Sequence, residues 1–151
     1  LMNENYAQPD LPAGAEDGVI RGGYRLAAYG SGAPRVTLAG SGAILTEVVK
    51  AAELLAADGI ASDVLSITSW GELARDGAYT LQLLAGDGPI IAASDYVRAV
   101  PESIRQHVPA GRRYTTLGTD GFGRSDTRAA LRQFFGVDAA SIARAARESL
   151  R

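Results

Sequence analysis

The sequence predicts an α/β fold in which a mainly parallel sheet carries helices on both faces, forming a three-layer sandwich. Short runs rich in Val, Leu and Ile alternate along the chain with segments of helical periodicity, and this alternation is typical of βαβ crossovers between parallel strands. The chain has 151 residues, the size of one ordinary domain, and such a chain buries roughly 70% of its unfolded surface. We therefore expect a single folded domain.

The first 34 residues are expected to form an interdomain linker and an N-terminal extension, and the α/β domain is expected at residues 35–151. Two prolines and a glycine punctuate the polar stretch between residues 9 and 14, which favours a linker over a core element. Residues 19–29 are apolar enough for a short helix or an edge strand, although a Gly-Gly pair argues against a stable isolated helix. Both alternatives stay open.

The first regular unit is a strand, a tight loop and a helix. Residues 35–39 predict a short strand, Gly40-Ser41-Gly42 predicts the loop, and residues 43–57 predict the helix. Apolar side chains recur at helical spacing along this helix, at Ile44, Val48, Ala52 and Leu55. Gly59 stands where a helix commonly ends.

The same alternation continues to the end of the sequence. Further strands are predicted at residues 61–67, 89–94 and 113–117, with a helix at residues 100–108. Two closing helices follow, the first capped by Ser125 or Asp126 and the second capped by Asp138.

The composition excludes several classes of function. Without any cysteine, the chain has no disulfide, no thiolate nucleophile and no Cys-ligated metal, and a net charge of −2 offers no basic footprint for nucleic acid. Residues 101–151 hold nine Arg against five acids, which we interpret as a solvated or subunit-facing surface. No apolar run is long enough for a membrane span and no signal peptide is apparent, so a cytoplasmic location without membrane contact is expected.

Gly40, Ser41 and Gly42 form the candidate anion site of this chain. A loop between a strand and a helix presents free backbone N–H groups and the positive end of the helix, where an anion can bind. The segment lacks both the full glycine spacing of dinucleotide sites and the lysine of phosphate-binding loops. Plain tight-turn geometry is therefore the main alternative to a phosphate pocket.

The chain supplies no self-sufficient catalytic set, so no catalytic, cofactor-binding or metal-binding residue is assigned. A Ser-His-Asp triad would have to use the one histidine, His107, with Asp95 and Ser41 or Ser94, but the Gly-x-Ser-x-Gly elbow is absent. The aspartates are not spaced as ligands of a hard cation.

The most distinctive segment is the glycine-rich loop at residues 118–126. Its central residues are the candidate interdomain or active-site-entrance loop, namely Asp120, Gly121, Phe122, Gly123, Arg124 and Ser125. Three glycines surround an aromatic residue just before a helix, and glycines permit backbone angles that other residues avoid. The alternative is a structured turn that seats Phe122 in the core and caps the next helix.

Several of these runs together resemble the carboxy-terminal domain of the homodimeric pyruvate dehydrogenase decarboxylating components, which are transketolase-like thiamine diphosphate enzymes. The resemblance spans nearly the whole chain. It is carried by residues 2–6, 40–42 with the following helix, 69–77, 93–96 and 118–128.

The resemblance implies an enzyme that decarboxylates pyruvate and reductively acetylates lipoyl groups. In this family the first two domains hold thiamine diphosphate, its Mg²⁺ and the activating glutamate, so no cofactor is expected in this chain. The third domain, which this chain resembles, mainly supports the dimer and the shape of the active-site entrance. The implied partners are the remaining domains of the enzyme, the homodimer partner and the dihydrolipoyl acetyltransferase core.

One departure from the family concerns the segment after the Glu-Leu-Ala-Arg-Asp-Gly run at residues 72–77. Family members carry roughly twenty more residues there, whereas here Gly77 is followed at once by Ala78. We therefore expect a chain break or an abrupt junction at Gly77–Ala78, and an exposed apolar patch where other domains are missing. A small-molecule module that binds an anion is the alternative function, and an independent enzyme is the least supported one.

Overall fold

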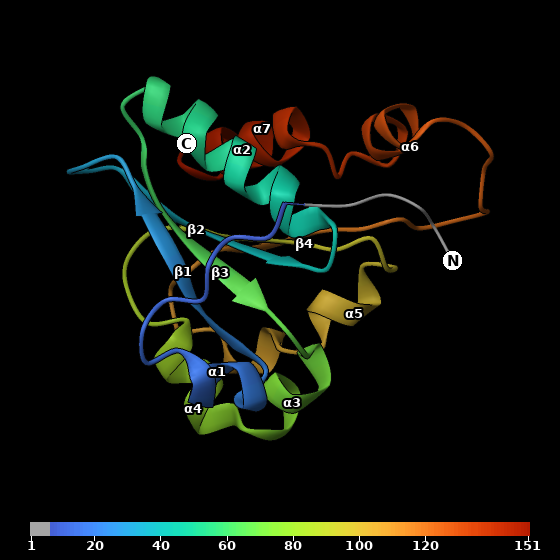
Figure 1. The fold of residues 1–151 in the computed structure, drawn as a ribbon. Coiled ribbons are helices and arrows are strands. Elements are labelled where there is room, and N and C mark those ends of the chain that lie inside the picture. Colours follow the sequence, from blue (N-terminus) through green and yellow to red (C-terminus); the bar gives the residue numbers. More distant parts are fainter. Residues whose placement is uncertain (1–6) are drawn as a thin grey trace.

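The computed structural model describes residues 7–151 and contains a five-stranded sheet in the order β1-β3-β2-β4-β5 (Figure 1). Strands β2 to β5 run parallel, whereas β1 pairs with β3 in the antiparallel sense. Helices cover both faces of the sheet, so the predicted three-layer α/β fold is confirmed. The strands are β1 (Gly23–Tyr29), β2 (Arg35–Ser41), β3 (Ala61–Ile67), β4 (Ile90–Ala93) and β5 (Tyr114–Leu117).

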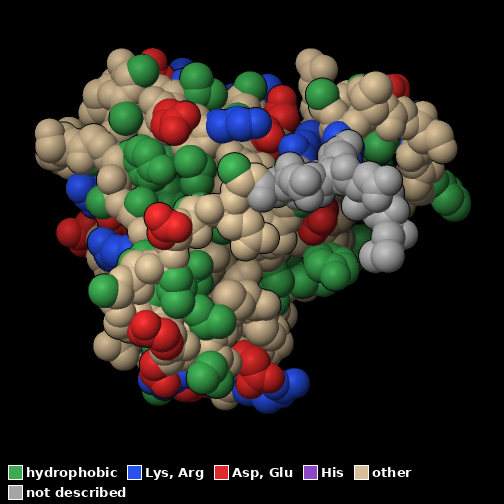
Figure 2. Space-filling model, viewed as in Figure 1, with side chains coloured by type: hydrophobic (Ala, Val, Ile, Leu, Met, Phe, Trp, Pro, Cys, Tyr) green, Lys and Arg blue, Asp and Glu red, His purple; other side chains and the backbone are tan. Residues whose placement is uncertain are grey.

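One face of the sheet packs against α2 (Ile44–Ala57) and α7 (Ala139–Ser149), with α6 (Arg128–Phe135) extending beyond them (Figure 1). Val48 of α2, Ile91 of β4 and Ile142 of α7 are fully buried in this core. Hydrophobic side chains also gather on the visible surface where β1 meets α2 (Figure 2).

The opposite face carries short elements only. They are α1 (Glu16–Arg21), α3 (Trp70–Arg75), α4 (Gly77–Leu83), α5 (Ala99–Glu102) and the 3₁₀ turn η1 (Arg105–His107). Ile90 of β4 belongs to this second core, whereas its neighbour Ile91 belongs to the first, because successive side chains of a strand point to opposite faces. Strand β4 is therefore buried on both faces and contributes side chains to both cores.

Residues 19–29 resolve into both of the alternatives left open by the sequence. The chain forms α1, turns at Gly22 with a φ of 103°, and then enters edge strand β1. A residue with a side chain at Gly22 would place its Cβ 2.5 Å from the carbonyl oxygen of Ser69. The sheet thus includes residues that were expected in the linker, because β1 completes its hydrogen bonds only against β3.

Two further expectations need correction, and a third is confirmed. The helix expected at residues 100–108 is divided into α5 and η1, and the Ser103 hydroxyl donates to the Val100 carbonyl at the end of α5. Helix α6 is capped by Thr127, whose hydroxyl accepts from the backbone N–H of Ala130, and not by Ser125 or Asp126. The cap at Asp138 is confirmed, since its carboxylate accepts from the Ser141 N–H.

Of the chain break or abrupt junction expected at Gly77–Ala78, the structure shows a direct junction without a break, because both residues lie in the continuous helix α4. The two helices α3 and α4 meet at Asp76, which ends the first and caps the second by accepting from the Tyr79 N–H. This single-residue connection leaves no separate loop between them. The residues 2–6 quoted for the family resemblance lie outside the described part of the chain.

Candidate functional site

The three segments singled out in the sequence meet at one edge of the sheet, because β2, β4 and β5 are parallel and their carboxyl ends lie together. In open α/β sheets, ligand sites are found outside this edge. Residues 40–42 end β2, residues 94–98 follow β4, and residues 118–125 follow β5. We take this edge as the candidate site.

The Gly40-Ser41-Gly42 segment is shaped first by packing. A Cβ at Gly40 would lie 2.7 Å from the Cγ2 of Val48, so glycine lets α2 approach β2 closely. The Ser41 hydroxyl is buried and hydrogen-bonded to the Ser94 hydroxyl at 3.1 Å, which ties the ends of β2 and β4 together. Gly42 adopts a φ of 53°, and the first residues of α2 have no side-chain cap.

The loops after β4 and β5 are joined by a short set of hydrogen bonds. Asp120 accepts from the backbone N–H of Arg98 at 2.9 Å and from its guanidinium Nε at 2.5 Å. Thr119 donates its N–H to the Tyr96 carbonyl and its hydroxyl to the Asp95 carbonyl, at 2.9 and 2.6 Å. These hydrogen bonds connect the two loops, and we call the connected loops the loop clamp.

Asp120 is ionised at neutral pH in this setting. The backbone N–H of Arg98, followed by its guanidinium, lowers the pKa of the Asp120 carboxyl below its ordinary value. Gly118 lies directly beneath the clamp, since a Cβ there would come within 2.6 Å of the Tyr96 carbonyl oxygen.

The glycine-rich loop does not seat Phe122 in the core. Phe122 is 95% exposed, which overturns the alternative of a buried anchor, and residues 120–126 show no regular secondary structure. Gly121 adopts a φ of 95°, a conformation that residues with a Cβ rarely adopt. The Arg124 guanidinium lies 4.2 Å from the ring centre of Phe134, so the base of the loop rests on α6.

A cleft of about 550 Å³ lies between this loop and the start of α2. It brings the first residues of α2 together with the glycine-rich loop and with basic residues of α6. Its wall contains Ala43, Ile44, Asp95, Thr119, Gly121, Gly123, Arg124, Arg128, Leu131, Arg132, Phe135 and Val137. The glycine-rich loop thus borders one cleft with Ala43 and Ile44, the residues that directly follow Gly40-Ser41-Gly42, and the cleft wall has three arginines and one carboxylate.

His107 belongs to a different part of the fold. Its Nε2 lies 3.1 Å from the Ala74 carbonyl oxygen, and its ring covers Gly77, where a Cβ would lie 2.5 Å from the ring carbon. Ser94 instead bonds to Ser41, so the rejected triad has no geometric basis.

Sequence reasoning missed a buried carboxylate that holds the helices behind the cleft. Glu47 of α2 has a side chain only 10% exposed and accepts from the Arg132 guanidinium at 3.0 Å and from the Ala139 N–H at 3.1 Å. The signal was available, because Glu47 neighbours Val48 and Ile44 on the apolar side of the helix. A carboxylate on a buried face needs a partner.

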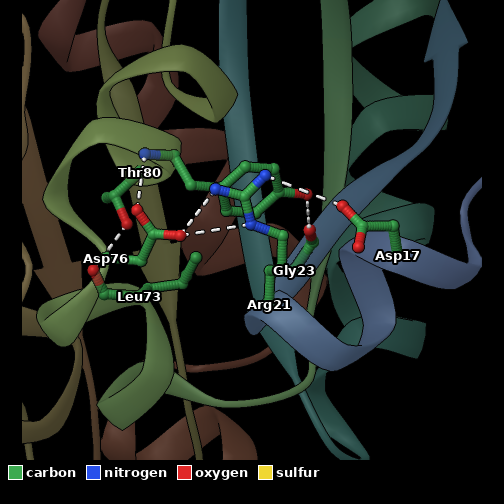
Figure 3. Close-up of polar contacts among 7 residues, drawn as sticks. Asp17, Arg21, Gly23, Leu73, Asp76 and Thr80 are labelled. Atoms are coloured by element: carbon green, nitrogen blue, oxygen red, sulfur yellow. Dashed lines mark hydrogen bonds and ion pairs between the residues drawn. The ribbon is translucent and has the colours of Figure 1, made fainter.

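A second missed group joins α1 to the α3–α4 pair (Figure 3). The Arg21 guanidinium donates to Asp76 at 2.6 Å and stacks 4.0 Å from the ring centre of Tyr79. The Tyr79 hydroxyl donates to the Gly23 carbonyl at 2.6 Å. Hydrogen bonds from Arg21, and then from the Tyr79 N–H, lower the pKa of Asp76. Figure 3 shows Arg21 between Asp76 and Asp17, so this contact holds the amino-terminal helix on the domain.

In residues 7–151, no three metal-ligating side chains lie close enough together to hold a cation. None of the helices in this range has the length and hydropathy needed to cross a bilayer.

The sequence profile of the transketolase-like TK C-terminal domain matches residues 22–138. The chain belongs to this family. It is also 46% identical to the pyruvate dehydrogenase E1 component of Cupriavidus necator over 99% of its own length, and 44% identical to that of Escherichia coli K12 over 96%. It spans about a fifth of these relatives, with 19% and 18% of their lengths covered.

Solved structures share the fold at lower sequence identity. Transketolase from Leishmania mexicana superposes on 88% of the chain with a TM-score of 0.68 at 22% identity, and 18% of that protein is covered. A split-gene transketolase, in the form of an inactive beta4 tetramer, gives a TM-score of 0.62 over 86% of the chain and 42% of that protein.

The domain is shorter than its relatives within the matched region. The alignment with the Cupriavidus necator enzyme extends over 171 positions, although the chain itself has 151 residues. The relative therefore carries additional residues inside this region. Their number agrees with the missing segment of roughly twenty residues expected next to Gly77.

Proposed function

We propose that this chain acts as the carboxy-terminal structural and dimerisation domain of a pyruvate dehydrogenase E1 component. The observation that carries the proposal is the 46% identity over nearly the whole chain to a protein of which it covers only 19%. The larger enzyme would decarboxylate pyruvate with thiamine diphosphate and Mg²⁺ bound by its other domains. It would reductively acetylate lipoyl groups of a dihydrolipoyl acetyltransferase core, as a cytoplasmic homodimer.

Within that enzyme, the chain would have a structural role and would supply no catalytic residue. The loop of residues 120–125 would form part of the interdomain contact at the active-site entrance, held in place by Arg98 and Asp120. A loop fixed before assembly loses little conformational entropy on binding, which favours a lasting contact.

The proposal can be tested by asking whether this chain restores activity to a related enzyme that lacks the corresponding domain. The Cupriavidus necator enzyme truncated before its matched region would be assayed for pyruvate-dependent reduction of an electron-accepting dye, alone and with the 151-residue chain added. We expect the truncated enzyme to lose most of its activity, the chain by itself to show none, and the mixture to regain a measurable part. Light scattering would follow the return of the dimer.

A chimera in which the chain is fused in place of the matched region serves as the control for weak association. Turnover of pyruvate by the chain alone would contradict the proposal. Full activity of the truncated enzyme would do so as well.

An anion site at Gly40, Ser41 and Gly42 remains the second candidate. The observation that favours it is the cleft, whose wall contains Ala43 and Ile44, directly after this segment, together with Arg124 and Arg128. The packing roles of Gly40 and Ser41 explain these residues without a ligand, so this proposal stands behind the first. Thermal stabilisation of the chain by phosphate but not by chloride at equal ionic strength would support it.

A further inference from the structure

Four large apolar side chains are exposed along the edge of the sheet where the candidate site lies. Tyr96 and Val97, which follow β4, are 64% and 46% exposed. Phe122 of the glycine-rich loop and Phe134 of α6 are 95% and 58% exposed. The loop clamp carries the first three residues, and the contact of Arg124 with the Phe134 ring joins α6 to the clamp. We call these four exposed apolar residues the apolar edge.

Helix α6 has an incompletely covered apolar side. It is an amphipathic helix of eight residues, and none of them is buried. Phe134 and Phe135 contact each other edge to face, with ring centres 5.0 Å apart, and Leu131 is only partly buried. An amphipathic helix is normally stabilised by packing its apolar side on another surface. Within residues 7–151, that surface is incomplete for α6.

The charged groups beside the apolar edge are paired within the chain. Arg132 pairs with Glu47 at 3.0 Å, and Arg98 pairs with Asp120 at 2.5 Å. The Arg124 guanidinium stacks on an aromatic ring of α6. A partner therefore gains little from a charge of either sign at this edge, and burial of apolar surface is the main driving force available for a contact.

The chain enters the domain next to this edge. Residues 7–9 border Leu45 and Val49 of α2, and Figure 1 shows the described chain beginning beside this helix. The immediately preceding residues, Ala43 and Ile44, line the cleft beside the glycine-rich loop. In the Cupriavidus necator relative, the matched C-terminal domain is 19% of the length, so most of that enzyme precedes it. Such a connection keeps the preceding part at high effective concentration near the apolar edge.

We propose that the apolar edge docks into an apolar groove on the part of the enzyme that precedes this domain, with Phe122 as the central anchor. The inference rests on the proposed function, because it names the partner of the loop that follows β5. The nearby chain entry, the paired charges and the uncovered side of α6 all favour this occupant. Aromatic side chains on a hydrogen-bonded framework bury a large area at low entropic cost, which suits them to such a contact.

Hydroxyl-radical footprinting tests the inference by measuring how quickly single side chains are oxidised, a rate that follows their exposure to water. The 151-residue chain would be compared with the chimera in which it replaces the matched region of the Cupriavidus necator enzyme. We expect the oxidation of Tyr96, Phe122 and Phe134 to fall about tenfold or more in the chimera, because the core of a protein contact excludes water. Ile20 and Leu81 are the internal controls, since they are 77% and 50% exposed on the opposite layer and should be oxidised equally in both proteins.

Phe122→Ser in the chimera tests the anchor itself. Its side chain is almost fully exposed in the domain, so the substitution leaves the domain's own packing intact. We expect it to raise the oxidation of Tyr96 and Phe134, whereas Ile20→Ser should leave both rates unchanged. The protection should be the same at low and high salt, because an apolar contact is not screened by ions.

Two outcomes would overturn the inference. One is equal oxidation of Phe122 in the chain and in the chimera. The other is protection of the chain alone that grows with its concentration and accompanies a dimer in light scattering, because the occupant would then be a second copy of the chain. If the chimera does not fold, the mixture of the chain with the truncated enzyme gives the same comparison.

The dye-reduction assay separates this inference from the proposed function. An active chimera in which Phe122 stays exposed contradicts only the docking of the apolar edge. A folded but inactive chimera in which Phe122 is protected contradicts only the proposed function.

Discussion

Substitution of Gly118 by alanine tests whether the clamp between the two loops is as tight as its geometry indicates. The added Cβ would lie 2.6 Å from the Tyr96 carbonyl oxygen and 2.7 Å from the Arg98 nitrogen. To reach the 3.4 Å of ordinary contact, these backbone atoms would have to retreat by about 0.7 to 0.8 Å. Both are backbone atoms that belong to the clamp, so the strain cannot be relieved by turning a side chain.

We expect Gly118→Ala to lower the free energy of unfolding by about 1 to 3 kcal/mol, the usual range for overpacking. In a domain of this size, each kcal/mol lowers the melting temperature by about 2 to 4 °C. Urea unfolding followed by tryptophan fluorescence, together with a thermal melt, would measure the change.

Gly123→Ala is the matched control, because a Cβ at this position would meet no atom within 4 Å and the φ of Gly123 is not in the left-handed region. That variant should change stability by less than about 0.5 kcal/mol. Equal stability of the two variants would refute the reasoning that the loops are held in close contact.

Three further substitutions probe the contacts that the sequence did not reveal. Glu47→Gln should cost about 2 kcal/mol, because the buried carboxylate loses its charge opposite Arg132, and urea unfolding at neutral pH would measure it; an unchanged midpoint would contradict the buried ion pair. Thr127→Ala should cost about 1 kcal/mol by removing the cap of α6, and a stable variant with unaltered helix content would speak against that cap. Asp76→Asn should make the free energy of unfolding fall less steeply as the pH is lowered. The pKa of Asp76 is lower in the folded state than its unfolded value of about 3.9, so its ionised form stabilises above that value and this stabilisation disappears as the pH falls through the folded pKa. Urea titrations from neutral to acid pH would compare the variant with the unchanged chain. An identical loss of stability at acid pH in the two proteins would show that the contact between Asp76 and Arg21 does not contribute to that loss.

Local signals predicted the regular elements well where they were strong. The helix after Gly42 follows its apolar spacing closely, and Asp138 caps α7 as its position before an amphipathic segment indicated. Signals were weaker at residues 100–108 and 125–127, where several polar residues could serve as caps. The Thr127 hydroxyl accepts from the Ala130 N–H at the start of α6, whereas the Ser103 hydroxyl donates to the Val100 carbonyl at the end of α5.

Only part of the candidate site could be predicted from the sequence. The glycine-rich segments announced loops, but nothing in them indicated that Asp120 would reach the backbone of Arg98, twenty-two residues earlier. That contact arises because β4 and β5 are adjacent in the sheet and end at the same edge. The pairing of β2 with β4 likewise brings the start of α2, which follows β2, into the same cleft as Arg124.

By itself, the sequence determined the fold class, the absence of thiol chemistry and the resemblance to a transketolase-like domain, because periodicity, composition and short motifs are local properties of the chain. The tertiary structure alone decided which residues share the cleft, that Phe122 faces solvent and that β1 completes the sheet. These outcomes depend on strand order and on contacts between distant segments. Such contacts form only when burial of both cores brings the strands together.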